Sequence, residues 1–309
     1  MVLGYIGYGE AAFEMSTGLR NEGLIDIVAF DNMVDHQVFG PMIKKRAKMA
    51  GVKLLDSPQK IAEISDLIIV AVPANITLSA CESVVQYLRA GQIYVDVSAA
   101  SPATKKCVAK LVGEQSIDFV DVAMMGVLPT FKHKVPILAS GTGALRFCKE
   151  MAPYGMDIEV VSEVAGAASG IKLIRSLCMK GLAALVMETL EASAEFGVED
   201  VVIPGICKTL EECSFEQTIH RLCTGTALHA ARRAAELSGS VEMLREVGLD
   251  STMVEAAMKK HELIAGYNLK ERFAGNAPKV WPLVIEAIKE IQSVSGIKKN
   301  AISVEGVVL

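Results

Sequence analysis

Several residue patterns that mark functional classes are missing from this sequence. The seven cysteines form no C-x-x-C pair and are odd in number, which is typical of reduced thiols in a cytosolic protein. Five histidines, with no H-E-x-x-H and no carboxylate cluster, predict no metal site. A net charge of −5 without a basic block argues against nucleic acids and anionic membranes as partners. No apolar run approaches the ~18 residues that span a bilayer.

The start of the chain and its composition indicate a cytoplasmic enzyme. The first expected strand begins at residue 2, so we expect no signal peptide before it. Aromatic residues make up only 5% of the chain, yet 51% of the residues are apolar, with many alanines, valines and methionines. A chain of 309 residues with this composition predicts about two domains with large cores.

The two halves of the chain differ in pattern. Over residues 1–162, short apolar runs alternate with helical stretches, which predicts an α/β Rossmann-type dinucleotide-binding domain with a mostly parallel sheet. The expected strands are Val2–Ile6, Ile27–Phe30, Leu67–Val72, Ile93–Val97, Phe119–Ala123, Ile137–Ser140 and Ile158–Val161. Residues 163–309 show no strand pattern, so we expect an all-helical domain for substrate binding and dimerisation.

A long helix is expected to join these two domains. Residues 164–196 contain no proline and are lined with small and apolar side chains. Further helical periodicity lies near 208–238, 240–247, 251–266 and 278–292. Because one small domain rarely buries so long an apolar helix, we expect a homodimer that covers it.

The strongest functional pattern follows the first strand. It comprises Gly7, Tyr8, Gly9, Glu10, Ala11 and Ala12, and an acidic residue, Asp31, ends the next apolar run. Gly7 allows a tight turn, and Gly9 lets the backbone approach a pyrophosphate, which the start of the following helix would bind. Asp31 lies 24 residues after Gly7, close to the ~20 expected for a carboxylate that binds a ribose hydroxyl. The pattern predicts NAD as the cofactor, because a carboxylate repels the 2′-phosphate of NADP. NADP stays the alternative cofactor.

Two later loops are expected to complete the cofactor site. Val72 and Pro73 end the third strong apolar run, and loops at the carboxyl ends of parallel strands bind ligands in such sheets. Ser98 follows another strand and is a candidate for the nicotinamide carboxamide, the alternative being a turn-capping role.

The long helix carries a group of polar residues within an apolar stretch. Lys172, Ser176 and Met179 fall on one helix face, with Arg175 and Lys180 on either side of it. One interpretation is that these cations reach a solvated edge. Their position just after a dinucleotide domain favours another, in which a partly desolvated Lys172 acts as an acid or base near neutral pH.

With these motifs, the chain resembles the β-hydroxyacid dehydrogenase family, which includes 3-hydroxyisobutyrate and 6-phosphogluconate dehydrogenases. It looks most similar to a poorly characterised branch with a distinctive helical C-terminal domain. The family motifs fall on Gly7, Gly9 and Ala12; on Val72 and Pro73; on Asp96, Ser98 and Pro102; and on Gly166, Ala168 and Lys172. The resemblance implies that Lys172 is the catalytic lysine, which exchanges a proton with the substrate hydroxyl.

Departures from the family concern the substrate. The loop usually written D-x-P-V-S-G-G reads Asp121–Val127 here, so the serine and one of the glycines that hold a substrate carboxylate are missing. Met125 stands in the place of the serine, and Met125 and Gly126 stay candidate substrate contacts. Most members carry asparagine where this chain has Arg175 and Ser176. Decarboxylating members need a glutamate where Met179 stands, so simple hydride transfer is expected.

Arg175 is the candidate that replaces the lost substrate loop. A guanidinium binds a carboxylate, sulfonate or phosphate through two parallel hydrogen bonds. We expect Arg175 to bind the anion of a small substrate, helped by Arg232 or Arg233 from a second copy of the chain, with Lys180 as a further contact. The alternative is an ion pair between Arg175 and Glu188, Glu191 or another helical acid.

Two other functions remain open from the sequence. An imine reductase on the same fold is one, although those relatives usually replace the lysine with aspartate or tyrosine. A non-catalytic dinucleotide-binding sensor is the other, favoured by the altered substrate loop and opposed by Lys172. The sequence does not identify the substrate.

Overall fold

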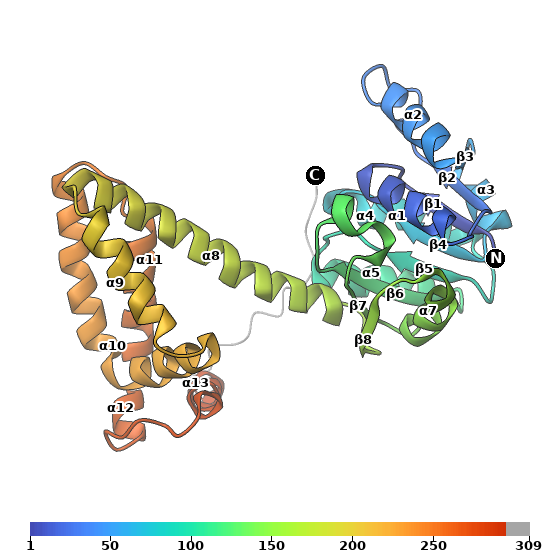
Figure 1. Ribbon diagram of the computed structural model, residues 1–309. Helices are drawn as coiled ribbons and strands as arrows, with labels where there is room; N and C mark the ends of the chain where they lie inside the picture. Colours follow the sequence, from blue (N-terminus) through green and yellow to red (C-terminus); the bar gives the residue numbers. More distant parts are fainter. Residues whose placement is uncertain (295–309) are drawn as a thin grey trace. The chain divides into compact units, whose positions relative to one another are not determined.

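A single eight-stranded sheet forms the centre of the N-terminal part in the computed structural model, which describes residues 1–294 (Figure 1). The strand order is β3-β2-β1-β4-β5-β6-β7-β8. The strands are β1 (Leu3–Ile6), β2 (Ile27–Phe30), β3 (Lys53–Leu54), β4 (Leu67–Val70), β5 (Ile93–Asp96), β6 (Asp118–Met124), β7 (Ile137–Ser140) and β8 (Ile158–Ser162). Strands β1 to β6 pair in parallel, whereas β6 and β7 pair antiparallel. The predicted mostly parallel sheet is confirmed.

Helices cover both faces of this sheet. They are α1 (Glu10–Asn21), α2 (Gly40–Ala50), α3 (Pro58–Ile64), α4 (Thr77–Val84), α5 (Pro102–Gly113), α6 (Leu128–Phe131) and α7 (Ala144–Met151). Short 3-10 turns lie at η1 (Ala74–Ile76), η2 (Val85–Tyr87), η3 (Lys132–Lys134) and η4 (Ala152–Tyr154). Apolar residues of α1, α2 and α7 pack in one core cluster, and those of α3, α4 and α5 pack in another on the opposite face. Burial on both faces explains why the strands read as continuous apolar runs.

The order of the strands defines where a ligand can bind. Strand β1 lies between β2 and β4, so the chain leaves β1 toward one side of the sheet and later continues on the other. In such sheets the crevice at the carboxyl ends of the strands, next to this change of direction, holds the ligand.

One row of residues lies in register across six strands. Strand pairing aligns Phe30 with Ile6, Ile6 with Val70, Val70 with Asp96, Asp96 with Asp121, and Asp121 with Ser140. The Gly7 turn follows immediately after this row on β1. The row therefore runs from the Gly7 turn to Ser140, the last residue of β7, which binds the first turn of the long helix.

The long helix α8 (Ala167–Phe196) runs through the boundary between two compact units of the chain. The first unit is Met1–Cys178, and the second begins at Met179. The sequence places the boundary at residues 162/163, where β8 ends. The first unit extends further because the opening turns of α8 are held by the sheet: the Ala168 N–H donates to Ser140 Oγ at 3.0 Å, and the Ser169 N–H donates to Asp121 Oδ2 at 3.0 Å.

The second unit is helical throughout its described residues. It contains α9 (Glu199–Glu211), α10 (Phe215–Glu246), α11 (Thr252–Ala265), α12 (Leu269–Arg272) and α13 (Trp281–Val294), as Figure 1 shows in yellow to red. One core cluster forms around Ala227, Leu269 and Val284, and a second around Val241 and Leu244. Among the described residues, the predicted all-helical second half is confirmed.

Buried Glu188 joins α8 to α11 within this unit. Its carboxylate accepts the Met253 and Val254 amides at 2.7 and 2.9 Å, at the N-terminus of α11. Carboxylates are stabilising at helix N-termini because these amides lack partners within the helix. Glu188 thus caps the N-terminus of α11. Within residues 1–294 it forms no ion pair with Arg175.

Element boundaries differ from the sequence-based expectation at a few places. Strand β3 was not predicted, since two residues carry too little pattern. The helix expected near 208–238 is divided in two: α9 starts at Glu199, includes Pro204 and ends at Glu211, and α10 begins at Phe215. Helix α10 continues through 239, where two helices were expected, and instead bends at His229, whose backbone is non-helical. In the described part of the chain, no helix is long and apolar enough to cross a membrane.

Candidate cofactor and catalytic site

A cleft of about 540 Å³ lies at the carboxyl ends of β1, β2 and β4. Its volume is within the range of small-molecule sites. Five of the residues expected to bind a cofactor line it, namely Gly7, Gly9, Asp31, Val72 and Pro73. The structure therefore brings together segments that are more than sixty residues apart in sequence, at the position where this class of sheet binds ligands.

Gly7 and Gly9 of the first turn are glycines for different structural reasons. Gly7 has φ of +83°, and a Cβ there would lie 2.5 Å from the Ala71 carbonyl oxygen. A side chain at Gly7 would therefore strain the turn and displace β4's exit loop. A Cβ on Gly9 would meet nothing within 4 Å. Gly9 thus presents bare backbone to the cleft, which suits the close approach of a pyrophosphate.

Helix α1 begins immediately after Gly9. No side chain caps its N-terminus, so its first amides are available to an anion. Glu10 is exposed and Ala11 half-buried, and neither lines the cleft. The Tyr8 side chain is fully buried, its hydroxyl lies 2.7 Å from Ser16 Oγ, and burial raises the pKa of Tyr8 to about 12. Tyr8 can therefore contact a cofactor through its backbone alone.

Asp31 is fixed at the rim of the cleft by two backbone amides. Its Oδ2 accepts the Tyr8 N–H at 2.7 Å, and its Oδ1 accepts the Met33 N–H at 2.8 Å. A carboxylate has about four acceptor positions, so capacity for ribose hydroxyls remains. These contacts hold the carboxylate in one orientation relative to the Gly7 turn.

Ser98 lies in the loop after β5 and is almost fully buried. Its N–H donates to Asp96 Oδ1 at 2.9 Å, and its Oγ accepts the Ala100 N–H at 3.4 Å. The Ser98 side chain thus stabilises the turn, which is the turn-capping interpretation of this residue. Ser98 does not line the cleft itself.

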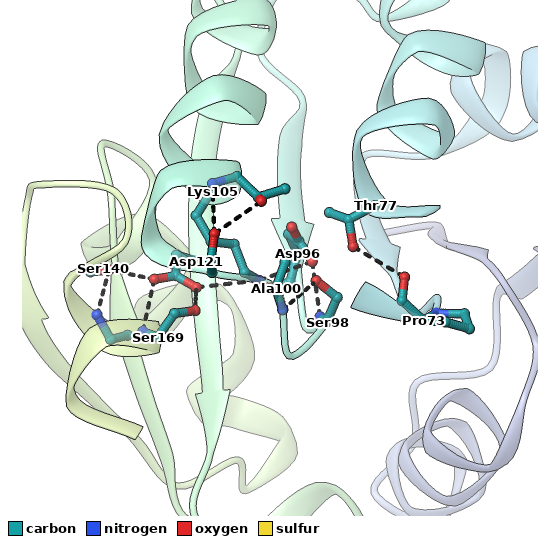
Figure 2. A network of polar contacts seen from close by, with 12 residues as sticks. Pro73, Thr77, Asp96, Ser98, Ala100, Lys105, Asp121, Ser140 and Ser169 are labelled. Atoms are coloured by element: carbon teal, nitrogen blue, oxygen red, sulfur yellow. Dashed lines mark hydrogen bonds and ion pairs between the residues drawn. The ribbon is translucent and has the colours of Figure 1, made fainter. Parts of the chain in front are cut away.

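Next to this loop is a fully buried polar network that the sequence analysis missed (Figure 2). Lys105 of α5 contacts Asp96 Oδ1 at 3.0 Å and Asp121 Oδ1 at 3.3 Å, and its Nζ donates to the Asp96 carbonyl at 2.8 Å. None of the three side chains is exposed. In the sequence, Lys105 is one of several lysines within a helical pattern, and nothing local predicts that its side chain is buried. Breaking such a buried pair typically costs about 3–5 kcal/mol.

The same network holds the first turn of α8. Asp121 accepts the Ser169 hydroxyl as well as its amide, and Ser140 Oγ donates to Asp121 Oδ2 at 3.2 Å. Gly166 has φ of +88°, and a Cβ there would lie 2.8 Å from the Pro102 carbonyl oxygen. Close packing against α5 and the carboxylate of Asp121 therefore fix where α8 starts.

Lys172 lies one turn further along α8, within the first unit. Ser169, Lys172 and Ser176 are spaced by three and four residues, so they share one stripe of the helix. Ser169 is buried, whereas Lys172 and Ser176 are half-buried, and most of their neighbours on α8 are exposed. This stripe is therefore the side of α8 that faces the first unit.

The substrate candidates are found in both units. Met125 is half-buried after β6, and its N–H donates to the Pro136 carbonyl at 2.7 Å; Gly126 is exposed beside it. Arg175 is exposed and makes no ion pair within residues 1–294. Lys180 and Arg232 belong to the second unit, where both are exposed and Arg232 pairs with Glu236 at 3.1 Å.

Several cleft residues had no motif to identify them. These are Met33, Pro58, Ile76, Ser79, Ala80 and Ser83. They supply apolar and hydroxyl groups from three helices and a loop, and only the folded sheet brings them beside Asp31. No cluster of metal-binding side chains occurs in the part of the chain that the structure describes.

Two family models match this chain. Residues 2–145 match the NAD binding domain of 6-phosphogluconate dehydrogenase, and residues 194–264 match a domain of unknown function, DUF1932. The first match contains the whole cleft. The second lies in the helical unit, whose role is thus not given by its family.

Two curated relatives illustrate the range of similarity. An uncharacterised 28.5 kDa protein of Methanothermus fervidus is 29% identical over 263 residues, which are 84% of this chain and 98% of that protein. The 2-(hydroxymethyl)glutarate dehydrogenase of Eubacterium barkeri is 25% identical over 204 residues, which are 64% of this chain and 65% of the enzyme. The chain thus matches slightly less than two thirds of that enzyme's length.

Solved structures show the same fold. A conserved protein of unknown function, described as structurally similar to 3-hydroxyacid dehydrogenases, has a TM-score of 0.60 at 29% identity, with 90% of this chain and all of that chain covered. An imine reductase variant from Myxococcus stipitatus in complex with NAD+ has a TM-score of 0.71 at 17% identity, covering 93% and 99%. The second likeness shows the fold alone. With the cleft, these findings show that residues 2–145 belong to the family of the NAD-binding domain of 6-phosphogluconate dehydrogenase, β-hydroxyacid dehydrogenase-like, and that a DUF1932 domain follows at residues 194–264.

Proposed function

We propose that this protein is an NAD-dependent oxidoreductase that interconverts a small hydroxy acid, or a similar alcohol bearing an anion, and the corresponding carbonyl compound. The observation that carries the proposal is the position of α8. Its first turn is held by Asp121 and Ser140, in the row of residues that also contains Ile6 next to the Gly7 turn. Lys172, one turn later, would then lie on the same carboxyl-end side of the sheet as the Gly7 turn.

The cleft fits a nicotinamide dinucleotide. Gly9 leaves room for a pyrophosphate, α1 begins there without a side-chain cap, and Asp31 offers acceptors for a ribose. When bound, the dinucleotide supplies or takes up the hydride, and the protein contributes position and electrostatics. A fixed carboxylate at the ribose end favours NAD over NADP, because the 2′-phosphate would be repelled.

Lys172 is the proposed proton carrier. During oxidation its amine accepts the proton of the substrate hydroxyl, and during reduction its ammonium returns that proton to the oxygen. Proton transfer by a positioned side chain typically accelerates a reaction by about 10²–10⁴-fold. Ser176, on the same stripe of α8, would donate a hydrogen bond to the same oxygen.

Arg175 is the proposed anion contact. It neighbours Lys172 by one turn of α8 and has no acidic partner within residues 1–294, so its guanidinium is available. The amides that open α8 are already bound by Asp121 and Ser140, so this helix start does not hold the substrate anion. Met125 would contribute apolar contact in place of the missing serine.

Two other functions would give different results in assays. An imine reductase would reduce a cyclic imine with a reduced dinucleotide, and the imine reductases similar to this chain support it by fold alone. The lysine at position 172 favours the hydroxy-acid reaction. A non-catalytic sensor would bind the cofactor without turnover of any member of a panel of hydroxy acids.

The role of Asp31 predicts the cofactor preference. We expect D31N to weaken NAD binding about tenfold or more, because a hydrogen bond to a charged group contributes about 1.5–3 kcal/mol. Binding of NADP should improve at the same time. Isothermal titration with both cofactors measures the two changes, and D35N on the same loop is the control, since Asp35 is exposed and pairs with Lys44. Equal loss of both cofactors would contradict the assignment.

Replacing the proton carrier should separate chemistry from cofactor binding. We expect K172A to lower kcat by at least about 10²-fold, the lower end of acid–base contributions, while the cofactor Kd changes less than about twofold. Steady-state kinetics and titration calorimetry give the two values. K149A, an exposed lysine change on α7, is the control. Turnover that survives K172A would rule out the mechanism.

Removing the guanidinium should affect substrate affinity. We expect R175A to raise KM for an anionic substrate about ten- to a hundredfold, as the loss of a charge-assisted hydrogen-bond pair implies, with a smaller change in kcat. R175K should restore part of the affinity. An alcohol of the same length without the anion should show the same KM in both proteins, and an unchanged KM for the acid would exclude this role.

We also propose that two copies of the chain associate through α8. Exposed apolar side chains are numerous along α8: Ile174, Leu177, Met179, Val186, Met187 and Leu190 are between 39% and 77% exposed. Monomers rarely leave so much apolar surface to water. Light scattering should give twice the 33.0 kDa chain mass, and M187E should shift the mass toward one chain. A monomeric wild-type protein would contradict this proposal.

A further inference from the structure

The buried Asp121 carboxylate has a role that extends to the reacting end of α8. We propose that Asp121, together with Ser169 and Ser140, forms a positioning device that sets the rotation of α8 and so directs Lys172 toward the substrate. This inference rests on the role of Lys172 under the proposed function. Asp121, Ser140 and Ser169 are buried and do not line the cleft, so they would act through the helix.

The contacts themselves define one rotation of the helix. Asp121 binds Ser169 twice, through the amide at 3.0 Å and the hydroxyl at 2.5 Å, and the preceding amide of Ala168 binds Ser140 Oγ at 3.0 Å. A backbone contact alone would fix the position of the helix start. The second contact, to a side chain that leaves the helix in one direction, also fixes which stripe faces the sheet. Lys172 lies on that stripe.

Asp121 is itself held from two other elements. Lys105 of α5 contacts its Oδ1 at 3.3 Å, and Ser140 of β7 donates to its Oδ2 at 3.2 Å (Figure 2). Lys105 also binds Asp96, whose Oδ1 accepts the N–H of Ser98. One chain of contacts therefore runs from the Ser98 loop to the first turn of α8, so the cofactor loop and the lysine are positioned by the same group.

Burial makes this device rigid. Asp96, Lys105, Asp121 and Ser140 have no exposed surface, and Ser169 has 4%. Without water to substitute for a lost partner, each group keeps its contacts in one geometry. Reaction rates depend steeply on such geometry, since a displacement of about 1 Å can lower a rate about a hundredfold.

The test removes the hydroxyl that sets the rotation while leaving the amide contact. We expect S169A to lower kcat about ten- to a hundredfold, with a cofactor Kd within about twofold of wild type. S140A, which removes the neighbouring contact, should act in the same direction. T142A is the matched control: the Thr142 hydroxyl, just after β7, accepts the Phe119 amide of β6 at 3.1 Å, and among the described residues no hydrogen bond joins it to α8. Its kcat should equal that of wild type.

A merely structural role would give another pattern. In that case S169A and T142A would both lower the melting temperature, and kcat measured well below that temperature would stay at the wild-type value in both. A kcat for S169A within twofold of wild type would overturn the inference.

A second readout needs no turnover, so that failure of the proposed function is recognised separately. An amine-specific reagent followed by mass spectrometry gives the ratio of Lys172 to Lys180 labelling, with the exposed Lys180 as internal reference on α8. We expect the ratio to rise in S169A and to stay constant in T142A. If the wild-type protein converts no hydroxy acid, the proposed function fails, and the labelling ratio alone decides whether Asp121, Ser140 and Ser169 position Lys172. An unchanged ratio in S169A would overturn the positioning role.

Discussion

The interaction on which the rest of the structure depends is the buried contact of Asp121 with Lys105 and Ser169. It lies in the row of residues that crosses six strands at the level of the Gly7 turn. A charged pair inside a protein is stable only when its remaining donors and acceptors are satisfied. Asp121 meets that condition by taking donors from α5, β7 and α8, and the start of the long helix is fixed as a consequence.

This arrangement divides the work between two parts of the first unit. The turn at Gly7 and Gly9, with Asp31, provides a conventional place for a dinucleotide. The lysine proposed to carry the proton comes from α8, whose first turn is held by Asp121 and Ser140 of the same row. Because α8 continues into the helical unit, the family's cofactor domain is combined here with a DUF1932 domain whose role no family description gives.

The proposed substrate contact would differ from the motif of the family that the sequence resembles. Met125 stands where that motif has a serine, and under the proposed function Arg175 would supply the anion contact instead. The contact would then lie on α8 and not in the loop after β6. A guanidinium binds two oxygens at once, so such a site would favour planar or multi-oxygen anions.

Much of the first unit could be predicted from local pattern. Strands buried on both faces are apolar throughout, so β1, β2, β4 and β7 were found within two residues of their observed ends. The turn at Gly7 was also predictable, because only glycine tolerates its φ of +83°. Two-residue β3 was missed because it is too short to show a period, and α9, which contains a proline, was not separated from α10.

The sequence by itself determined the class of sheet, the dinucleotide turn and the position of Lys172 on a long helix. Each of these follows from residues close together in the chain. Only the tertiary structure decided that Lys105, Asp96, Asp121 and Ser169 meet, and that Glu188 caps α11. Polar groups become buried partners when distant segments fold against one another, and no local period or motif records which donor will face which acceptor.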